Sequence, residues 1–272
     1  DMALLTFLPL GYFVLSSTGK QKYMAFTFIM QNIAANLGGM LTPFGNPQNL
    51  YLYSKFNIPD GEFMLIMLPP FLLSIALIPL CAVIFVKPEP LLFSGIERRL
   101  PKARVSIYLL LFVLSIVCVF KVIPYWIALI VVVPVIFIMD KGALLKVDYG
   151  LLLTFVFFFI FAGNMARIGL VREIFSFLLD KSTLLFSALS CQFISNVPSA
   201  ILLSQFTENY RELLLGVNIG GCGTLISSLA SLITFREYAS HSPKGVSKYI
   251  LVFSLFNFAF LAILIGFCFI FV

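Results

Sequence analysis

A polar motif of seven residues occurs twice in this chain, each time inside a long apolar stretch. Asn36-Leu-Gly-Gly-Met-Leu-Thr42 returns 182 positions later as Asn218-Ile-Gly-Gly-Cys-Gly-Thr224. Paired glycines weaken a helix, and in hydrocarbon the amides and carbonyls that they free are costly unless another group binds them. Freed carbonyls with Asn and Thr oxygens suit a cation, whereas helix N-termini favour anions. The two motifs therefore predict a lined cavity for a small ion or an anionic solute.

The residues alone leave a second explanation open, because small residues also let membrane helices approach closely, and a short match can arise by chance. Polar character nevertheless continues beyond the motif, where Asn46 pairs with Ser228 and Asn49 with Ser231. By composition, 42–49 could be a surface loop, but its counterpart 224–231 lies in an uninterrupted apolar stretch. The predicted site residues are Asn36, Gly38, Gly39, Thr42, Asn46 and Asn49 in the first copy, and Asn218, Gly220, Gly221 and Thr224 in the second.

Two further segments combine polar groups with an apolar setting. Ser195-Asn196-Val-Pro198 supplies a hydroxyl, an amide and a helix break together, although a proline kink alone would also explain it. Asp1 adjoins an apolar run at a predicted hairpin tip, where it could carry a proton or help to bind a cation. As the first residue it could equally be a solvated end. Ser195, Asn196, Pro198 and Asp1 complete the candidate site.

Composition sets the class of protein. Of the 272 residues, 61% are hydrophobic and 11% are charged, and the mean hydropathy is +1.06. These values predict an all-α polytopic membrane protein. Apolar stretches near the ~20 residues that span a bilayer recur along the chain. They cover 61–86, 105–120, 122–139, 149–163, 182–206, 213–235 and 249–272.

Several classes of function are excluded or disfavoured. The sequence offers no Ser/His/Asp set, metal motif or phosphate loop, so we expect no enzyme and no cofactor beyond a sodium ion or proton as coupling ion. An intramembrane enzyme or a structural subunit is the alternative of another class. The five cysteines show no metal-ligand spacing and are interpreted as core residues, so no metal is expected beyond a possible sodium ion. A positive-inside bias explains the net charge of +6 without nucleic acid.

Counting Lys and Arg predicts the orientation. If 18–22, 87–104, 140–148 and 236–248 are cytoplasmic, those segments hold twelve of the 18 basic residues and the others hold six. The stretch 182–206 then begins and ends outside and must turn back as a re-entrant hairpin. By the same logic, 2–17 is the returning arm of a hairpin that entered from the cytoplasm, and sequence upstream of residue 1 is expected.

The orientation predicts inverted-topology repeats, each with a re-entrant hairpin and a broken transmembrane helix. The predicted domains are a first repeat over 1–86, a cytoplasmic basic linker over 87–104 and a second repeat over 105–272. Within them, 23–53 crosses once, 61–86 returns, 105–139 forms two helices joined near 121–125, and 149–163 crosses outward. The charged segments 140–148, 164–181 and 236–248 are expected to be loops.

At these residues the chain resembles the ion transporter superfamily, which holds citrate and dicarboxylate transporters, arsenite permeases and some sodium/proton antiporters. The opening Asp1 to Pro9 looks like that family's first hairpin, and Ser195-Asn196 is similar to the Ser-Asn signature of its second. Asn46 stands where arsenite and antiporter relatives have an Asp. Val197-Pro198 follows the Ser-Asn pair where dicarboxylate carriers typically have a Thr, so a dicarboxylate-binding Thr is not matched.

The resemblance implies a secondary active transporter for an anion or oxyanion, such as citrate or a dicarboxylate. Transport would be coupled to sodium or protons and proceed by alternating access, with a transport domain moving against a scaffold. Arsenite efflux and sodium/proton antiport are the alternatives. The implied partners are a small anionic solute, the lipid bilayer and a second copy in a homodimer, with no nucleic acid. The implied location is a bacterial-type plasma (inner) membrane, as an integral multi-pass protein.

Overall fold

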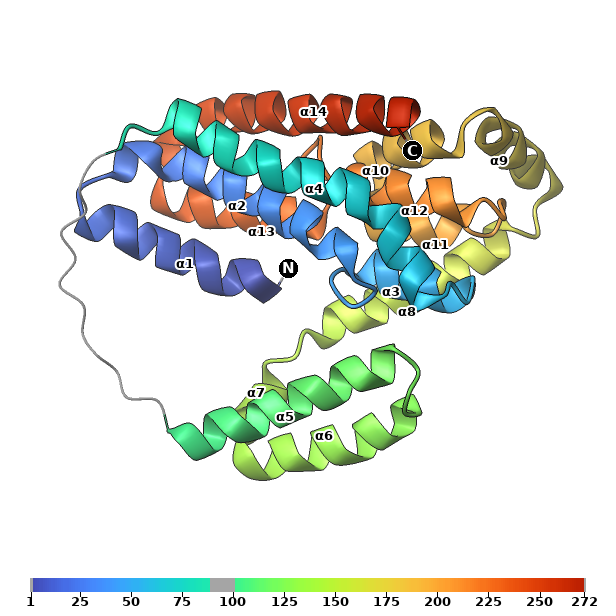
Figure 1. The fold of residues 1–272 in the computed structure, drawn as a ribbon, viewed down its shortest axis with the longest axis horizontal. Coiled ribbons are helices and arrows are strands. Elements are labelled where there is room, and N and C mark those ends of the chain that lie inside the picture. The colour runs from blue at the N-terminus through green and yellow to red at the C-terminus, as the bar shows by residue number, and fades with distance from the viewer. Residues whose placement is uncertain (1, 89–100, 272) are drawn as a thin grey trace. The chain divides into compact units, whose positions relative to one another are not determined.

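The computed structural model describes residues 2–88 and 101–271, and every regular element in these ranges is helical. The predicted all-α class is confirmed (Figure 1). Asp1 and residues 89–100, which include most of the predicted linker, lie outside the described residues. The chain divides into two compact units, one made of Asp1–Phe93 with Phe158–Val272 and the other of Ser94–Phe157. All the described candidate site residues belong to the first, which we call the larger unit.

The smaller unit is a helical hairpin. Helices α5 (Lys102–Val119) and α6 (Tyr125–Met139) pack together and are followed by the short helix α7 (Lys141–Leu145). The turn between α5 and α6 has Lys121 at a φ of 58°, and Pro124 precedes the first residue of α6. The predicted pair of helices is therefore confirmed. The chain passes into the larger unit within α8 (Tyr149–Met165).

The first part of the larger unit contains the first broken helix. It comprises α1 (Met2–Ser17), α2 (Met24–Gly38), the 3-10 turn Gly39–Leu41, α3 (Pro47–Lys55) and α4 (Asp60–Phe85). Helix α2 ends where Gly38 and Gly39 remove side chains from the turn, as glycines at a C-terminus commonly do. Asn46 has the extended backbone of an N-cap and Pro47 the fixed φ of a first helical residue, so α3 begins there.

The second part begins with α9 (Gly169–Lys181) and a hairpin made of α10 (Thr183–Ile194) and α11 (Asn196–Leu203). The hairpin is broken at Ser195, which has a φ of 71°, as predicted for the stretch 182–206. Helix α12 (Tyr210–Ile219) ends at the second glycine pair. The chain continues through α13 (Leu229–His241) into α14 (Val246–Phe271).

The two parts of the larger unit follow one plan. The N-caps of α3 and α13, Asn46 and Ser228, are 182 positions apart and have φ and ψ of −137° and 149° against −150° and 153°. The helices that follow, α4 and α14, each have 26 residues. Contacts are mirrored as well, because α1 packs on α2 and α13 while α11 packs on α12 and α3. Helices α4 and α14 lie side by side and run in opposite directions (Figure 1), as an inverted repeat requires.

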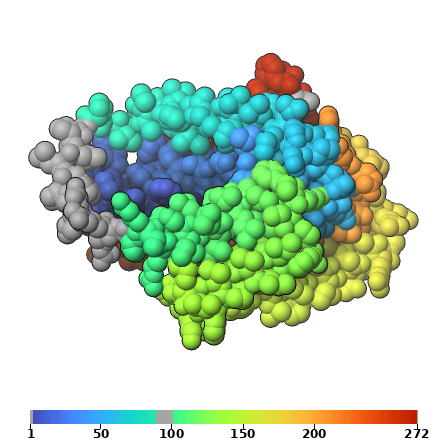
Figure 2. All heavy atoms as spheres, turned by 60° about the horizontal axis from the view of Figure 1, so that its bottom comes forward, coloured from blue at the N-terminus to red at the C-terminus, as the bar shows by residue number. Residues whose placement is uncertain are grey.

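Helix lengths fit a membrane protein with interrupted spans. Among the described residues, Asp60–Phe85, Lys102–Val119 and Pro243–Phe271 are long and apolar enough to cross a bilayer. Helices α8 and α9 would together form a fourth span that bends by 98°. Side chains of α4 such as Leu65 and Val83 are 70% and 78% exposed, and this helix forms a continuous surface ridge in Figure 2. In a membrane protein such an apolar ridge faces lipid or another apolar partner.

One expectation needs correction. The charged segment 164–181 was expected to be a loop, but most of it forms α9. Val171, Phe175 and Leu179 recur at intervals of four residues and pack onto the hydrophobic core of the larger unit. The charged residues of α9 lie between apolar residues that keep their helical spacing. A prediction based on charge density alone therefore missed an amphipathic helix. Parts of 140–148 and 236–248 are likewise helical.

Candidate functional site

The two chain breaks meet inside the larger unit and hydrogen-bond to each other reciprocally. Asn36 Nδ2 donates to Ser228 Oγ at 3.1 Å and to the Gly221 carbonyl at 3.3 Å. From the other copy, Asn218 Oδ1 accepts from Asn46 Nδ2 at 3.5 Å. The repeat makes Asn36 equivalent to Asn218 and Asn46 equivalent to Ser228, so these contacts mirror each other. We call the four residues Asn36, Asn46, Asn218 and Ser228 the interlock.

Asn218 lies at the centre of the interlock, and its side chain is 1% exposed. Its Nδ2 donates to Asn49 Oδ1 at 2.6 Å and to the Leu214 carbonyl at 2.8 Å. Its Oδ1 also accepts from Gln48 Nε2 at 3.2 Å. Both amide protons and both oxygen lone pairs of Asn218 are thus engaged, mostly by residues of the first copy.

Asn49 closes the first break. Its Nδ2 lies 3.1 to 3.2 Å from the carbonyl oxygens of Gly39, Met40 and Thr42. These carbonyls lie in the break that follows α2, and that of Thr42 also accepts from the Gly45 amide at 3.1 Å. A neutral amide therefore satisfies them, which removes the penalty for exposing them in an apolar environment.

Gln192 of α10 closes the second break in the same manner. Its Nε2 donates to the carbonyls of Gly220 at 2.9 Å and Cys222 at 3.1 Å, and its Oε1 accepts from the Thr224 amide at 2.9 Å. Gly223 has a φ of +127°, and a Cβ there would come within 2.0 Å of Gln192 Oε1. Only glycine fits at this turn.

The hairpin tip docks on the second break. The Asn196 amide donates to the Ser227 carbonyl at 2.9 Å, and Asn196 Oδ1 accepts from the Val197 amide at 2.9 Å. Ser195 lies next to it with a φ of 71°, a conformation that costs a non-glycine residue about 1–3 kcal/mol. Pro198 is buried in the first turn of α11. Strain held at a polar tip is typical of a functional position.

The four predicted glycines have different surroundings. A Cβ on Gly39 would lie 2.4 Å from Asn46 Oδ1, and one on Gly221 would lie 3.5 Å from Asn36 Oδ1, so both glycines border the interlock. A Cβ on Gly220 would lie 2.9 Å from Ala188 Cα, which makes that glycine a packing contact with α10. A Cβ on Gly38 would meet nothing within 4 Å among the described residues. Ligand contacts of all four remain predictions.

The remaining predicted residues are partly brought together. Asn46 and Asn49 lie in the interlock region, whereas Thr42 and Thr224 contribute backbone groups at the two breaks, and Thr224 Oγ1 also donates to the Gln192 carbonyl. Sequence reasoning did not select Gln48 or Gln192. Both amides are buried. Gln192 lies in an apolar stretch, which was the signal that could have found it, whereas Gln48 lies in the polar segment 42–49 between the selected Asn46 and Asn49.

The buried polar side chains of the described residues are uncharged. Among them all are Asn, Gln, Ser or Thr, apart from tyrosines. Their N–H and O–H groups can donate to an anion, and their oxygens can coordinate a cation. Recognition in this region would therefore rest on oriented dipoles and hydrogen bonds.

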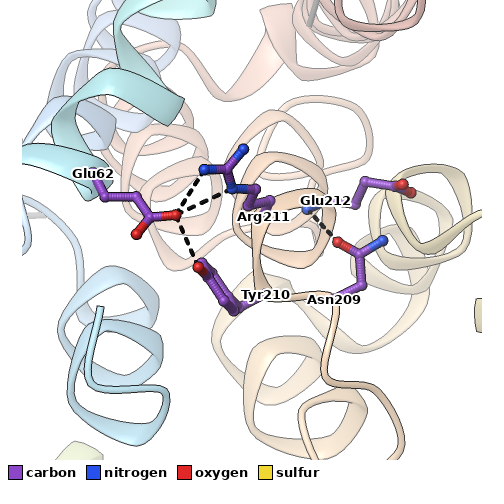
Figure 3. A network of polar contacts seen from close by, with 5 residues as sticks. All are labelled: Glu62, Asn209, Tyr210, Arg211 and Glu212. Atoms are coloured by element: carbon purple, nitrogen blue, oxygen red, sulfur yellow. Dashed lines mark hydrogen bonds and ion pairs between the residues drawn. The ribbon is translucent and has the colours of Figure 1, made fainter. Parts of the chain in front are cut away.

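A charged cluster lies elsewhere in the larger unit, at the start of α4 and α12 (Figure 3). Glu62 Oε1 accepts from the Tyr210 hydroxyl at 2.8 Å and from Arg211 Nε and Nη2 at 3.1 and 2.8 Å. Asn209 caps α12, and Glu212 accepts from the Leu184 amide at the start of α10. The cluster borders a cavity of about 1120 Å³. It ties α4 of the first copy to α12 of the second.

Replacing Glu62 tests how much that tie contributes. Arg211 is 64% exposed in its side chain, so the pair is screened by water and salt. We expect Glu62→Gln to lower the melting temperature slightly at low ionic strength and to match the unsubstituted protein in high salt. Thermal unfolding in detergent at two salt concentrations measures this. A large loss that salt does not change would show that the cluster is structural rather than ionic.

Comparison with known proteins shows which sequences this chain resembles. The family model described as "Citrate transporter" matches residues 2–209. The chain is 34% identical over 274 residues to the protein named "Uncharacterized transporter MJ0456" of Methanocaldococcus jannaschii, which covers 100% of this chain and 74% of that protein. It is 30% identical over 214 residues to "Inner membrane protein YbiR" of Escherichia coli strain K12, covering 76% of this chain and 57% of that protein. No solved structure matches.

These matches bear on the class of protein. The matched residues 2–209 include α1 to α11 and with them the first broken helix and the hairpin tip. Both the family description and the name of the first relative indicate a transporter rather than an enzyme. Together with the long apolar helices, they identify an integral membrane protein of the transporter class. The chain therefore belongs to the citrate transporter family.

Proposed function

We propose that this protein is a secondary active transporter that moves a small anion or oxyanion, such as an organic carboxylate, across a bacterial-type plasma membrane. Sodium ions or protons would drive transport, and the mechanism would be alternating access. The interlock carries the proposal. Two helix breaks that hydrogen-bond through Asn36, Asn46, Asn218 and Ser228 support it, because inverted-repeat transporters bind their solutes between such breaks.

The geometry suggests how a solute would be held. The first turns of α3, α11 and α13 begin at Asn46, Ser195 and Ser228, and helix N-termini favour negative charge. Asn36 and Asn218 would add amide donors without a buried charge. A dicarboxylate or oxyanion bound there would exchange some interlock hydrogen bonds for its own. Such an exchange would let ligand binding change the contacts between the two copies, which alternating access requires.

Flux through proteoliposomes tests the function directly. The purified protein, reconstituted in its full length, should accumulate labelled solute only when a sodium or proton gradient is imposed, and dissipating the gradient should stop uptake. Citrate, succinate, sulfate and arsenite separate the substrate classes, and proton release without solute would identify antiport. Absence of gradient-dependent flux for every one of these solutes would overturn the transporter proposal.

Two alanine variants test the site. Asn36→Ala and Asn218→Ala each remove one side of the interlock, and we expect each to weaken solute affinity at least tenfold, since one lost hydrogen bond to a charged group costs about 1.5–3 kcal/mol. Asn164→Ala, at an exposed position of α8, is the matched control and should transport normally. Flux titrations at several solute concentrations measure the effect. Normal transport by both site variants would show that the repeated motif serves packing.

A further inference from the structure

A large cavity opens at one end of the larger unit, beside the charged cluster at the start of α4 and α12. Its volume is about 1120 Å³, whereas pockets for small ligands usually have ~300–1,000 Å³. The cavity lies where α4 and α12 begin, where α9 passes into α10 and where α14 ends. We call it the end cavity. It has room for a ligand larger than the solute proposed for the interlock.

The end cavity has a polar side and an apolar side. Its polar side chains, such as Asp180 and Arg211, belong to helix junctions or first turns. Leu65 and Leu215 lie deeper, because each follows the first residue of its helix, α4 or α12, by five positions, a rise of ~7.5 Å. Leu65 is 70% exposed and Phe269 of α14 is 56% exposed. The apolar side therefore continues into the apolar surface that faces lipid in a membrane protein.

The charges on the polar side are separated in space. Arg211 is directed toward α4, where Glu62 accepts from it, whereas the side chain of Glu212 points away from α4 (Figure 3). Glu212 Oε2 accepts from the Leu184 amide at 2.9 Å, which places this carboxylate at the start of α10. Asp180 lines the cavity at the same junction. The end cavity thus has a guanidinium near α4 and carboxylates near α10.

This separation favours a zwitterion over an ion of one sign. The lining contains three carboxylates against the two cations Lys181 and Arg211, and Lys181 Nζ lies 4.3 Å from the centroid of the Phe177 ring on its own helix. A ligand with negative charge alone would face the carboxylates near α10. A ligand with positive charge alone would face Arg211, which is 64% exposed in its side chain.

A phospholipid with an ammonium headgroup has the required groups in the required order. Phosphate oxygens accept from a guanidinium, often in two parallel hydrogen bonds, and a primary ammonium has three N–H donors for carboxylates. We propose that the end cavity binds a phospholipid of the phosphatidylethanolamine type. Its phosphate would lie on Arg211, its ammonium on Asp180 and Glu212, and its acyl chains along Leu65 and Phe269.

The direction of the end cavity agrees with the direction of a lipid in one leaflet. The polar groups lie at the helix ends and the apolar ones further along the helices, as headgroup and chains do. The count of Lys and Arg predicts that these helix ends lie outside, so the lipid would come from the outer leaflet. It would contact α4 of the first copy and, through Leu215, α12 of the second, three residues before Asn218. A bound lipid would therefore stabilise the packing of the two copies.

Native mass spectrometry of the full-length protein in detergent tests the lipid site without any transport. Phosphatidylethanolamine, phosphatidylcholine and phosphatidylglycerol with identical acyl chains are offered as an equimolar mixture. The unsubstituted protein should retain phosphatidylethanolamine in preference to the other two. Choline has no N–H donor for the carboxylates, and phosphatidylglycerol has no cation. Soluble phosphoethanolamine, which lacks acyl chains, should not displace the lipid.

A substitution that fills the end cavity tests its location. Gly61 lines the cavity in the first turn of α4, and a Cβ there would meet nothing within 4 Å among the described residues. Gly61→Phe should therefore fold and lose the preference for phosphatidylethanolamine. Gly169→Phe is the matched control, because Gly169 begins α9 outside the cavity lining and its Cβ would also meet nothing within 4 Å among these residues.

A substitution that removes one charge tests the headgroup. Asp180→Asn should reduce the preference for phosphatidylethanolamine over phosphatidylcholine about threefold, as expected for an exposed ion pair. Glu173→Gln, at an exposed position of α9 outside the cavity lining, is the control for loss of a carboxylate and should change nothing.

The outcomes are decisive for this site and independent of flux. Equal retention of the three lipids, or an unchanged preference in Gly61→Phe, would overturn the lipid site. Displacement by phosphoethanolamine would show that the end cavity takes a soluble zwitterion instead of a lipid. An unchanged preference in Asp180→Asn would overturn the ammonium contact, and this variant reports on the site even if Gly61→Phe does not fold.

Discussion

Gly45→Ala is expected to abolish transport and to lower the melting temperature more than any other single alanine substitution in the first break. A Cβ at Gly45 would lie 2.1 Å from the Gly39 carbonyl oxygen and 2.8 Å from its carbon. Backbone atoms cannot move aside as a flexible side chain can, so the turn after α2 must open. Overpacking of this kind typically costs about 1–3 kcal/mol, and opening the turn would also displace Asn46 from the interlock.

The measurement combines unfolding in detergent with flux in proteoliposomes. Gly266→Ala is the matched control, since a Cβ at this position of α14 meets nothing within 4 Å among the described residues. The control variant should retain both the melting temperature and transport. If Gly45→Ala behaves like Gly266→Ala, the close approach of Gly45 to Gly39 is not maintained in the working protein.

The positions of the two helix breaks could be predicted from the sequence because local residue preferences determine them. Glycine pairs end α2 and α12, and residues that cap well, Asn46 and Ser228, start the helices that follow. The proline and asparagine content of 42–49 permitted a surface loop. Comparison with the apolar counterpart 224–231 placed it inside the protein, and the burial of Gln48 and Asn49 confirms this.

The hydrogen-bond partners of the polar side chains could not be predicted from local residue preferences. Nothing in the spacing of Gln192 says that its amide reaches the carbonyls of Gly220 and Cys222, because the packing of α10 on α12 makes that contact. Asn32 and Asn257 are separated by 225 positions and meet only after α2 and α14 pack. Sequence periodicity locates buried amides but does not pair them.

Asn46→Asp is expected to destabilise the folded protein strongly at neutral pH and much less at acidic pH. Asn46 is 8% exposed, and its Nδ2 donates to the Asn36 carbonyl at 3.0 Å and to Asn218 Oδ1 at 3.5 Å. An ionised carboxylate would face both of these acceptors with no proton to donate, and burial adds a desolvation penalty. Asp has nearly the same size and shape as Asn, so the substitution changes charge and hydrogen bonding rather than volume.

The sign of the pH effect follows from where the proton is held. In the folded variant, the carboxyl at position 46 can donate a hydrogen bond only when it is protonated. It therefore keeps its proton to a higher pH than the same carboxyl in the unfolded chain, where Asp titrates near ~3.9. Between these two values the folded state binds more protons, and stability falls as the pH rises. The deficit relative to the unsubstituted protein should thus be small near pH ~4 and large near pH ~7.

Unfolding at a series of pH values measures this deficit, and Asn164→Asp, at an exposed position of α8, is the control that should show almost no pH-dependent difference. A loss of stability in Asn46→Asp that does not depend on pH would mean that the carboxylate finds a cationic or donor partner that Asn46 does not use. A loss that decreases with acid would instead establish that a neutral donor at position 46 holds the two copies together.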